Sequence, residues 1–248
     1  MQRISCALRK VVLSSRQLSP SFSTSIQNGI SSVKVHQTNE SLHFQLCSNN
    51  IDSSSLNSRP YILTPSMPSV REINELEISE GLIDAIASSI EEHYAIENSE
   101  QFVGGMGEND GGVWISSDTS VDTLYYWEDI RDIIEHVKQN RHGIPFGVFT
   151  SGITEDMEIA SNLKGIGLST IQVSLISSNP ESYAAIRGIK DLAKAQSDFG
   201  QVCNFIATAA ESGFPVIAAV VGKHGGAELA KALGAVDVAV YDGIGTSS

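Results

Sequence analysis

The chain has 248 residues, of which 41% are hydrophobic and 18% charged, a composition typical of a globular protein that can bury a sizeable core. Its formal net charge is −13 at pH 7, and this acidic excess argues against nucleic acid as a partner. No apolar run approaches the roughly 18 residues that a membrane-spanning helix needs, so no membrane span is expected.

The chain begins with a basic leader. Every charged residue before position 40 is basic: Arg3, Arg9, Lys10, Arg16 and Lys34. Apolar residues alternate with the first of these at helix-like spacing and then give way to Ser and Thr, which is typical of an organellar transit peptide, mitochondrial in preference to plastid. The alternative is a disordered tail without a targeting role. In both cases we expect residues 1–38 to lie outside the fold and residues 39–248 to form one domain.

The three cysteines, Cys6, Cys47 and Cys203, lie far apart in the sequence. They form neither a disulfide framework nor a Cys-x-x-Cys metal site. The cysteine content therefore fits a reducing compartment.

Beyond the leader, short apolar runs alternate with longer amphipathic ones. The expected strands are residues 41–46, 102–106, 145–151, 170–176, 216–221 and 236–241. The expected helices are residues 69–94, with an interruption near residues 77–81, and residues 126–140, 155–163, 180–186, 191–211 and 227–233. Residues 109–123 are expected to form a long acidic loop inserted after the second strand. Repeated strand–helix units predict an α/β fold built from parallel βαβ units.

The second expected strand ends in residues suited to a pocket. It runs into Gly104, Gly105 and Gly107, followed by Glu108. Glycine allows a ligand or a neighbouring backbone to approach closely, and the carboxylate accepts hydrogen bonds from a cationic or hydroxyl-bearing group. The alternative is a strand that ends in a solvated turn.

Six such units can form an open doubly wound sheet or a curled partial barrel. In both architectures ligands bind at the carboxyl ends of the strands. Small or polar residues occupy most of these ends: Cys47, residues 104–108, residues 150–152, Ser174, residues 222–224 and Asp242. The sequence therefore predicts a ligand site at this edge of the sheet.

The order of these motifs resembles the radical S-adenosylmethionine superfamily. Gly105-Met-Gly107-Glu108 resembles the family's Gly-Gly-Glu-Pro motif, Val148-Phe-Thr-Ser-Gly152 its third strand, and Val173-Ser-Leu-Ile176 with Tyr183 and Arg187 its fourth strand and following helix. The resemblance covers roughly residues 41–244 and implies a (β/α)6 partial TIM-type barrel of parallel strands. It also implies S-adenosylmethionine as a candidate ligand. The residues that would bind it are Gly104, Gly105, Gly107, Glu108, Ser151 and Ser174.

The first expected strand departs from this family. There the strand ends in Cys-x3-Cys-x2-Cys, whose thiolates hold a [4Fe–4S] cluster. Here Cys47 is followed by Ile51 and Ser54 at the other two positions, and Cys47 alone is insufficient, so no cluster is expected. The resemblance then implies a non-radical binding or regulatory module with a residual nucleoside pocket. Its partner would be a small-molecule ligand or another protein, such as an active paralogue.

Two alternatives remain, and with them the question of whether the chain is an enzyme. Lys223 and His224 follow the fifth expected strand, where a lysine could form a Schiff base with a carbonyl substrate, as in aldolase-like lyases. The same glycine-flanked pair also fits a solvated turn or an anion-binding helix start. The other alternative is an active iron–sulfur enzyme whose cysteines are missing from this sequence through an incorrect gene model.

Overall fold

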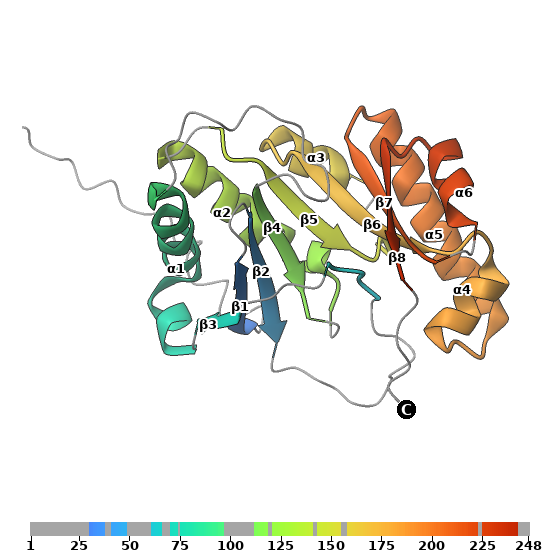
Figure 1. Cartoon of the computed structure of the whole chain (residues 1–248), viewed down its shortest axis with the longest axis horizontal. Helices are drawn as coiled ribbons and strands as arrows, with labels where there is room; N and C mark the ends of the chain where they lie inside the picture. Colours follow the sequence, from blue (N-terminus) through green and yellow to red (C-terminus); the bar gives the residue numbers. More distant parts are fainter. Residues whose placement is uncertain are drawn as a thin grey trace, which may run out of the picture.

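The structure is a computed structural model that describes residues 30–37, 41–48, 61–65, 70–73, 75–96, 112–118, 121–140, 143–154, 158–222 and 225–242. Strands and helices alternate along most of this length (Figure 1). The strands are β1 (Ile30–Gln37), β2 (Ser41–Ser48), β3 (Val70–Ile73), β4 (Gly112–Ser117), β5 (Phe146–Thr150), β6 (Thr170–Ile176), β7 (Val216–Val221) and β8 (Asp237–Tyr241). The helices are α1 (Glu75–Ile96), α2 (Trp127–Asn140), α3 (Ile159–Gly165), α4 (Pro180–Arg187), α5 (Leu192–Glu211) and α6 (Gly226–Ala232), with a 3₁₀ turn η4 (Thr123–Tyr126).

The described strands form one sheet in the order β3-β1-β2-β4-β5-β6-β7-β8. From β2 to β8 neighbouring strands are parallel, whereas β1 pairs antiparallel with both β2 and β3. Each parallel strand is added beside the one before it, without the reversal of order that defines a doubly wound sheet. This is the order of a singly wound barrel, so the expected α/β partial TIM-type barrel is confirmed.

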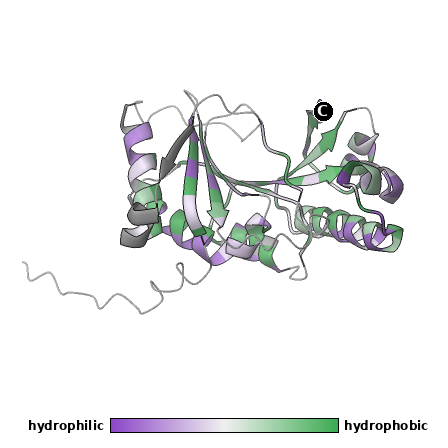
Figure 2. Cartoon of the chain, turned by 90° about the horizontal axis from the view of Figure 1, so that it is seen from below, coloured by the Kyte–Doolittle hydropathy of each residue, from purple (hydrophilic) through white to green (hydrophobic). Residues whose placement is uncertain are grey.

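The outer face of the sheet packs against the helices. Along β2, Leu42, Phe44 and Leu46 alternate into the main core, as Ile171, Val173 and Leu175 do along β6. Apolar residues of α1, α2, α3, α5 and α6 belong to the same core. Figure 2 shows hydrophobic residues along the strands and on parts of the helices that flank them. Burial of this layer supplies most of the stability that positions the strand ends.

The inner face carries the alternate side chains and holds a smaller apolar cluster. Trp114 of β4 stacks on Phe149 of β5 with ring centroids 4.5 Å apart, and both pack with Ile217 and Ala239. Gly147 makes room for the indole, because a Cβ atom at that position would lie 2.5 Å from the Trp114 ring. The middle of the inner face is therefore filled by side chains.

The second parallel strand differs from the sequence expectation. Residues 102–106 lie outside the described residues, and the strand that pairs with β2 is β4. β4 and η4 occupy much of the predicted loop 109–123, so that loop assignment is wrong. Both segments carry short apolar runs, but the second of the parallel strands is β4, in which Val113, Trp114 and Ile115 are buried.

The fold also begins earlier than expected. Residues 30–37, which we placed in the leader, form β1, where Val33 and Val35 are buried against α1 and β2. β3 replaces the start of the predicted helix 69–94. The expected interruption of that helix is confirmed at Gly81 of α1, whose φ is 147°. None of the helices described here is both long and apolar enough to cross a bilayer.

Candidate functional site

Four neighbouring parallel strands end in polar residues that lie in one row. The register pairs Leu46 with Ser117, Ile115 with Val148, and Thr150 with Val173. The residues that continue these pairings form what we call the strand-end row: Cys47, Asp118, Ser151 and Ser174. The structure thus brings together three residues predicted from the sequence. It adds Asp118, which was missed because it lay in the predicted loop.

Ser151 is held by an acid that the sequence reasoning did not identify. One Asp122 carboxylate oxygen accepts hydrogen bonds from the Ser151 amide at 2.8 Å and the Ser151 hydroxyl at 2.5 Å. The other oxygen accepts from the Thr150 hydroxyl at 2.7 Å and from the Leu124 amide at 2.9 Å, where Asp122 caps η4. Four hydrogen bonds to one carboxylate hold these two segments firmly together. Ser151 therefore joins the end of β5 to the segment after β4.

The end of β4 is fixed in a similar way. The Asp118 amide donates to the Leu46 carbonyl at 2.7 Å, and an Asp118 carboxylate oxygen accepts from the Ser48 amide at 3.0 Å. The Ser117 amide donates to the Thr123 hydroxyl at 2.8 Å. Asp118 thus joins the ends of β2 and β4, in the position along the sheet where the sequence analysis expected an acid.

Ser174 contacts a segment that is distant in the sequence. The Leu63 amide donates to the Ser174 hydroxyl oxygen at 2.9 Å. Gln172, two residues earlier on the same face of β6, donates from Nε2 to the Leu63 carbonyl at 3.1 Å and to the Tyr241 hydroxyl at 2.8 Å. The predicted ligand residue Ser174 therefore binds the protein's own backbone in this structure.

The end of β6 is also strained. The register of β6 with β7 shifts between Ser174 and Ile176, and Ile176 has a φ of 70°. A β-branched residue in the left-handed region costs roughly 1–3 kcal/mol and persists only where its surroundings require it. Ile176 is buried against Leu63 and Tyr183, which explains how that conformation is kept beside Ser174.

Two histidines lie on the inner face, one on β1 and one on β2. The His43 ring stacks on His36 with centroids 5.5 Å apart, and His43 Nε2 shares a hydrogen bond of 2.7 Å with the Ser116 hydroxyl. Burial, and to a smaller extent the neighbouring His36, lowers the pKa of His43 to about 3. His43 is therefore neutral at physiological pH and serves as a packed polar residue of the core.

This depressed pKa predicts acid sensitivity. Between about pH 6.5 and about pH 3, the unfolded chain binds a proton at His43 that the folded chain does not, so the free energy of unfolding should fall as the pH falls. The slope from this residue is at most about 1.4 kcal/mol per pH unit. Urea unfolding across this range should give a shallower pH dependence for His43→Gln than for the unsubstituted protein. Equal slopes would contradict the assignment.

Cys47 lies at the end of β2, where the family resemblance requires the first cluster ligand. Its thiol donates to the Gln45 carbonyl at 3.6 Å. Cys203 is in α5 on the outer face, packed against the main core, and burial raises its pKa. Among the described residues, no three His, Cys, Asp or Glu side chains converge in a possible metal site. In the sequence, Ile51 and Ser54 stand at the two positions where the family resemblance places the other cluster cysteines.

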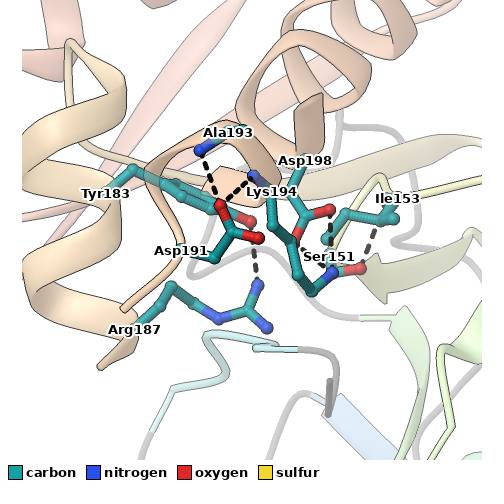
Figure 3. Close-up of polar contacts among 8 residues, drawn as sticks. All are labelled: Ser151, Ile153, Tyr183, Arg187, Asp191, Ala193, Lys194 and Asp198. Carbon is teal, nitrogen blue, oxygen red and sulfur yellow. Dashed lines mark hydrogen bonds and ion pairs between the residues drawn. The ribbon is translucent and has the colours of Figure 1, made fainter. Parts of the chain in front are cut away.

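The junction of α4 and α5 carries a group of polar side chains near the carboxyl edge of the sheet (Figure 3). Arg187 donates to the Tyr183 hydroxyl at 2.8 Å. Asp191 caps α5 by accepting from the amides of Ala193 and Lys194, and the Lys194 ammonium pairs with Asp198 at 3.0 Å. These polar side chains therefore serve to cap α5 and to form contacts between residues four apart within α4 and within α5.

Other predicted site residues lie outside the described part of the chain. They are Gly104, Gly105, Gly107, Glu108, Lys223 and His224. The cofactor role of the glycines and Glu108, and the lysine of the aldolase-like alternative, therefore remain predictions.

Comparison with known proteins extends this picture. The sequence matches the Radical SAM superfamily over residues 87–231, a range that begins within α1 and does not include β2 or Cys47. A comparison with curated proteins finds no match. Among solved structures, the chain is similar to methylornithine synthase (PylB), with 14% identity, a TM-score of 0.42, and coverage of 71% of this chain and 46% of that one. The chain thus spans less than half the length of that enzyme. Because the family match covers more than half of the sequence, the protein belongs to the Radical SAM superfamily.

Proposed function

We propose that this protein is a Radical SAM superfamily member without the cluster ligands, acting as a non-radical binding or regulatory module. Its partner would be a small molecule at the strand-end row or another protein. The fold and the family are those of a catalytic superfamily. The end of β2, however, offers one cysteine where the catalytic members have three cluster ligands.

One observation carries this proposal: Cys47 is the single thiol at the end of β2. No cysteine occurs between Cys47 and Cys203, and Cys203 belongs to a helix on the opposite face of the sheet. A [4Fe–4S] cluster with an open iron needs three thiolates. A lone thiol leaves two of those positions without a ligand.

Anaerobic reconstitution with iron and sulfide tests the proposal directly. The unsubstituted protein should show no cluster absorbance. The matched control is Ile51→Cys combined with Ser54→Cys, which restores the Cys-x3-Cys-x2-Cys spacing after Cys47. This variant should gain absorbance if the scaffold is otherwise intact. A stoichiometric cluster in the unsubstituted protein would refute the proposal.

S-adenosylmethionine is the candidate ligand. Support comes from the family and from the row of Cys47, Asp118, Ser151 and Ser174 at the edge where parallel α/β sheets bind ligands. Calorimetry should detect binding to the unsubstituted protein, with Ser174→Ala weakening it about tenfold through the loss of one hydrogen bond. Glu108→Ala tests the predicted acid. If all three proteins give the same heats, neither residue belongs to the site.

The proposal also includes that the leader targets the protein to mitochondria. Because β1 starts at Ile30 and pairs with two strands, we expect the mature chain to begin before that residue. N-terminal sequencing of the protein recovered from mitochondria tests both points. A start after Gln37, or recovery from another compartment, would contradict them.

A further inference from the structure

We propose that residues 61–65 form a displaceable strap that covers part of the strand-end row. The strap (Tyr61-Ile-Leu-Thr-Pro65) lies across the inner face of the sheet, over Gln172 and the predicted ligand residue Ser174 of β6. Any small molecule that binds Ser174 must take the position that Leu63 now occupies.

Two side chains of β6 hold the strap through its backbone. Ser174 accepts a hydrogen bond from the Leu63 amide, and Gln172 donates one to the Leu63 carbonyl. Both polar groups of a single residue are therefore bound by neighbouring side chains on the inner face. This two-point clamp recognises an extended main chain and depends little on the side chain at position 63.

Apolar and aromatic contacts complete the docking. Leu63 packs with Ile176, Ala219 and Val221, and Ile62 packs against the cluster around Trp114. The Arg187 guanidinium lies 5.9 Å from the Tyr61 ring centroid, within reach of a cation–π contact. The strap thus bridges the ends of β6 and β7 to α4.

The strap is held less firmly than the sheet beneath it. Leu63 is the single buried residue of the strap, whereas all seven residues of β6 are buried and the strand is hydrogen-bonded to β5 and to β7. Segments with few buried apolar contacts open at lower free energy than the elements that support them. We therefore expect the strap to leave while the sheet stays folded.

An unsatisfied acceptor points the same way. Gln172 is 1% exposed, and its Oε1 atom has no hydrogen-bond partner among the described residues. The strap uses the Gln172 amide nitrogen and leaves the oxygen without a donor. A ligand that supplies both an acceptor and a donor would satisfy this side chain more completely than the strap does. The claim that the strap gates such a ligand rests on the proposed function. The claim that the strap opens is independent of it.

A pair of reporter cysteines on one strand tests the opening without any ligand. In a chain whose three native cysteines are replaced by alanine, Ala219→Cys places a thiol under the strap, and Ala218→Cys places one on the helix-covered face of β7. Both alanines are 0% exposed. Under native conditions the thiol at position 219 should react with a labelling reagent at least about tenfold faster than the thiol at position 218.

Leu63→Ala keeps the backbone clamp and removes the buried side chain. It should speed labelling at position 219 about tenfold. At position 218 the labelling rate, divided by the rate expected from global unfolding of the same variant, should stay unchanged. Equal labelling rates at the two positions, with the same denaturant dependence, would overturn the proposal. If a reporter variant does not fold, hydrogen exchange of the unsubstituted protein decides instead: the Leu63 amide should exchange faster than the Val173 amide, and equal rates would overturn the strap.

Calorimetry with S-adenosylmethionine then tests the gate separately. Leu63→Ala should bind it about tenfold more tightly than the unsubstituted protein, because less strap is displaced. Equal affinities would overturn gating. Absence of heat in both proteins would reject this ligand, and with it the ligand of the proposed function, while the labelling result still stands.

Discussion

Deleting residues 1–38 should abolish cooperative folding, whereas deleting residues 1–29 should leave it intact. The longer deletion removes β1, which pairs with β2 and is the described partner of β3. It also removes the buried side chains of Val33 and Val35, each worth about 1.5–3 kcal/mol. These losses, with those of two ladders of hydrogen bonds, approach the roughly 5–15 kcal/mol that stabilises a typical domain.

Urea unfolding followed by circular dichroism distinguishes the two truncated chains. The chain that starts at Ile30 retains every described contact and should unfold in one transition with the midpoint of the full chain. The chain that starts at Asn39 should show a broad transition or none. A cooperative transition with an unchanged midpoint in the shorter chain would mean that β1 contributes little to the fold.

Gly152→Ala should destabilise the protein by roughly 2–5 kcal/mol. Gly152 follows Ser151 at the end of β5 and has a φ of 74°, where an alanine costs roughly 1–2 kcal/mol. A Cβ atom there would also lie 2.6 Å from Val173 Cγ1 in the core, an overlap that adds about 1–3 kcal/mol. Thermal and urea unfolding measure the change.

Gly188→Ala is the matched control for this substitution. Gly188 ends α4 with a φ of 66°, and a Cβ atom there meets nothing within 4 Å, so the control carries the backbone strain without the overlap. Gly152→Ala should be the more destabilising of the two. Adding Val173→Ala should recover about 0.5–3 kcal/mol relative to the sum of the single changes. Equal destabilisation by both glycine substitutions, with no coupling to Val173, would contradict the packing at the end of β5.

The parallel strands were predictable where the apolar run was long and bounded by turns. Val216–Val221 has six consecutive apolar residues, and the structure places it in the sheet with those bounds. β4 was not predictable in the same way, because Val113, Trp114 and Ile115 are followed by Ser116 and Ser117, and a polar ending reads as loop in isolation. Its place beside β2 depends on pairing with strands elsewhere in the chain.

β1 had a signal that its surroundings concealed. Val33 and Val35 alternate with Lys34 and His36, the period of a half-buried strand, but the pattern lies directly after a basic, acid-free leader. The partners of the site residues had no local signal. Asp122 reaches Ser151 and Leu63 reaches Ser174 only because the sheet brings distant segments together. Cys47, Ser151 and Ser174 of the strand-end row were therefore predictable, whereas Asp118 and the groups that bind the row were not.

The iron and acid-labile sulfide content of the mature chain, purified without oxygen, tests the central claim most directly. With Cys47 as the lone thiol at the end of β2, we expect well below one iron and one sulfide per chain. About four of each per chain would show that a [4Fe–4S] cluster is bound and would contradict the account.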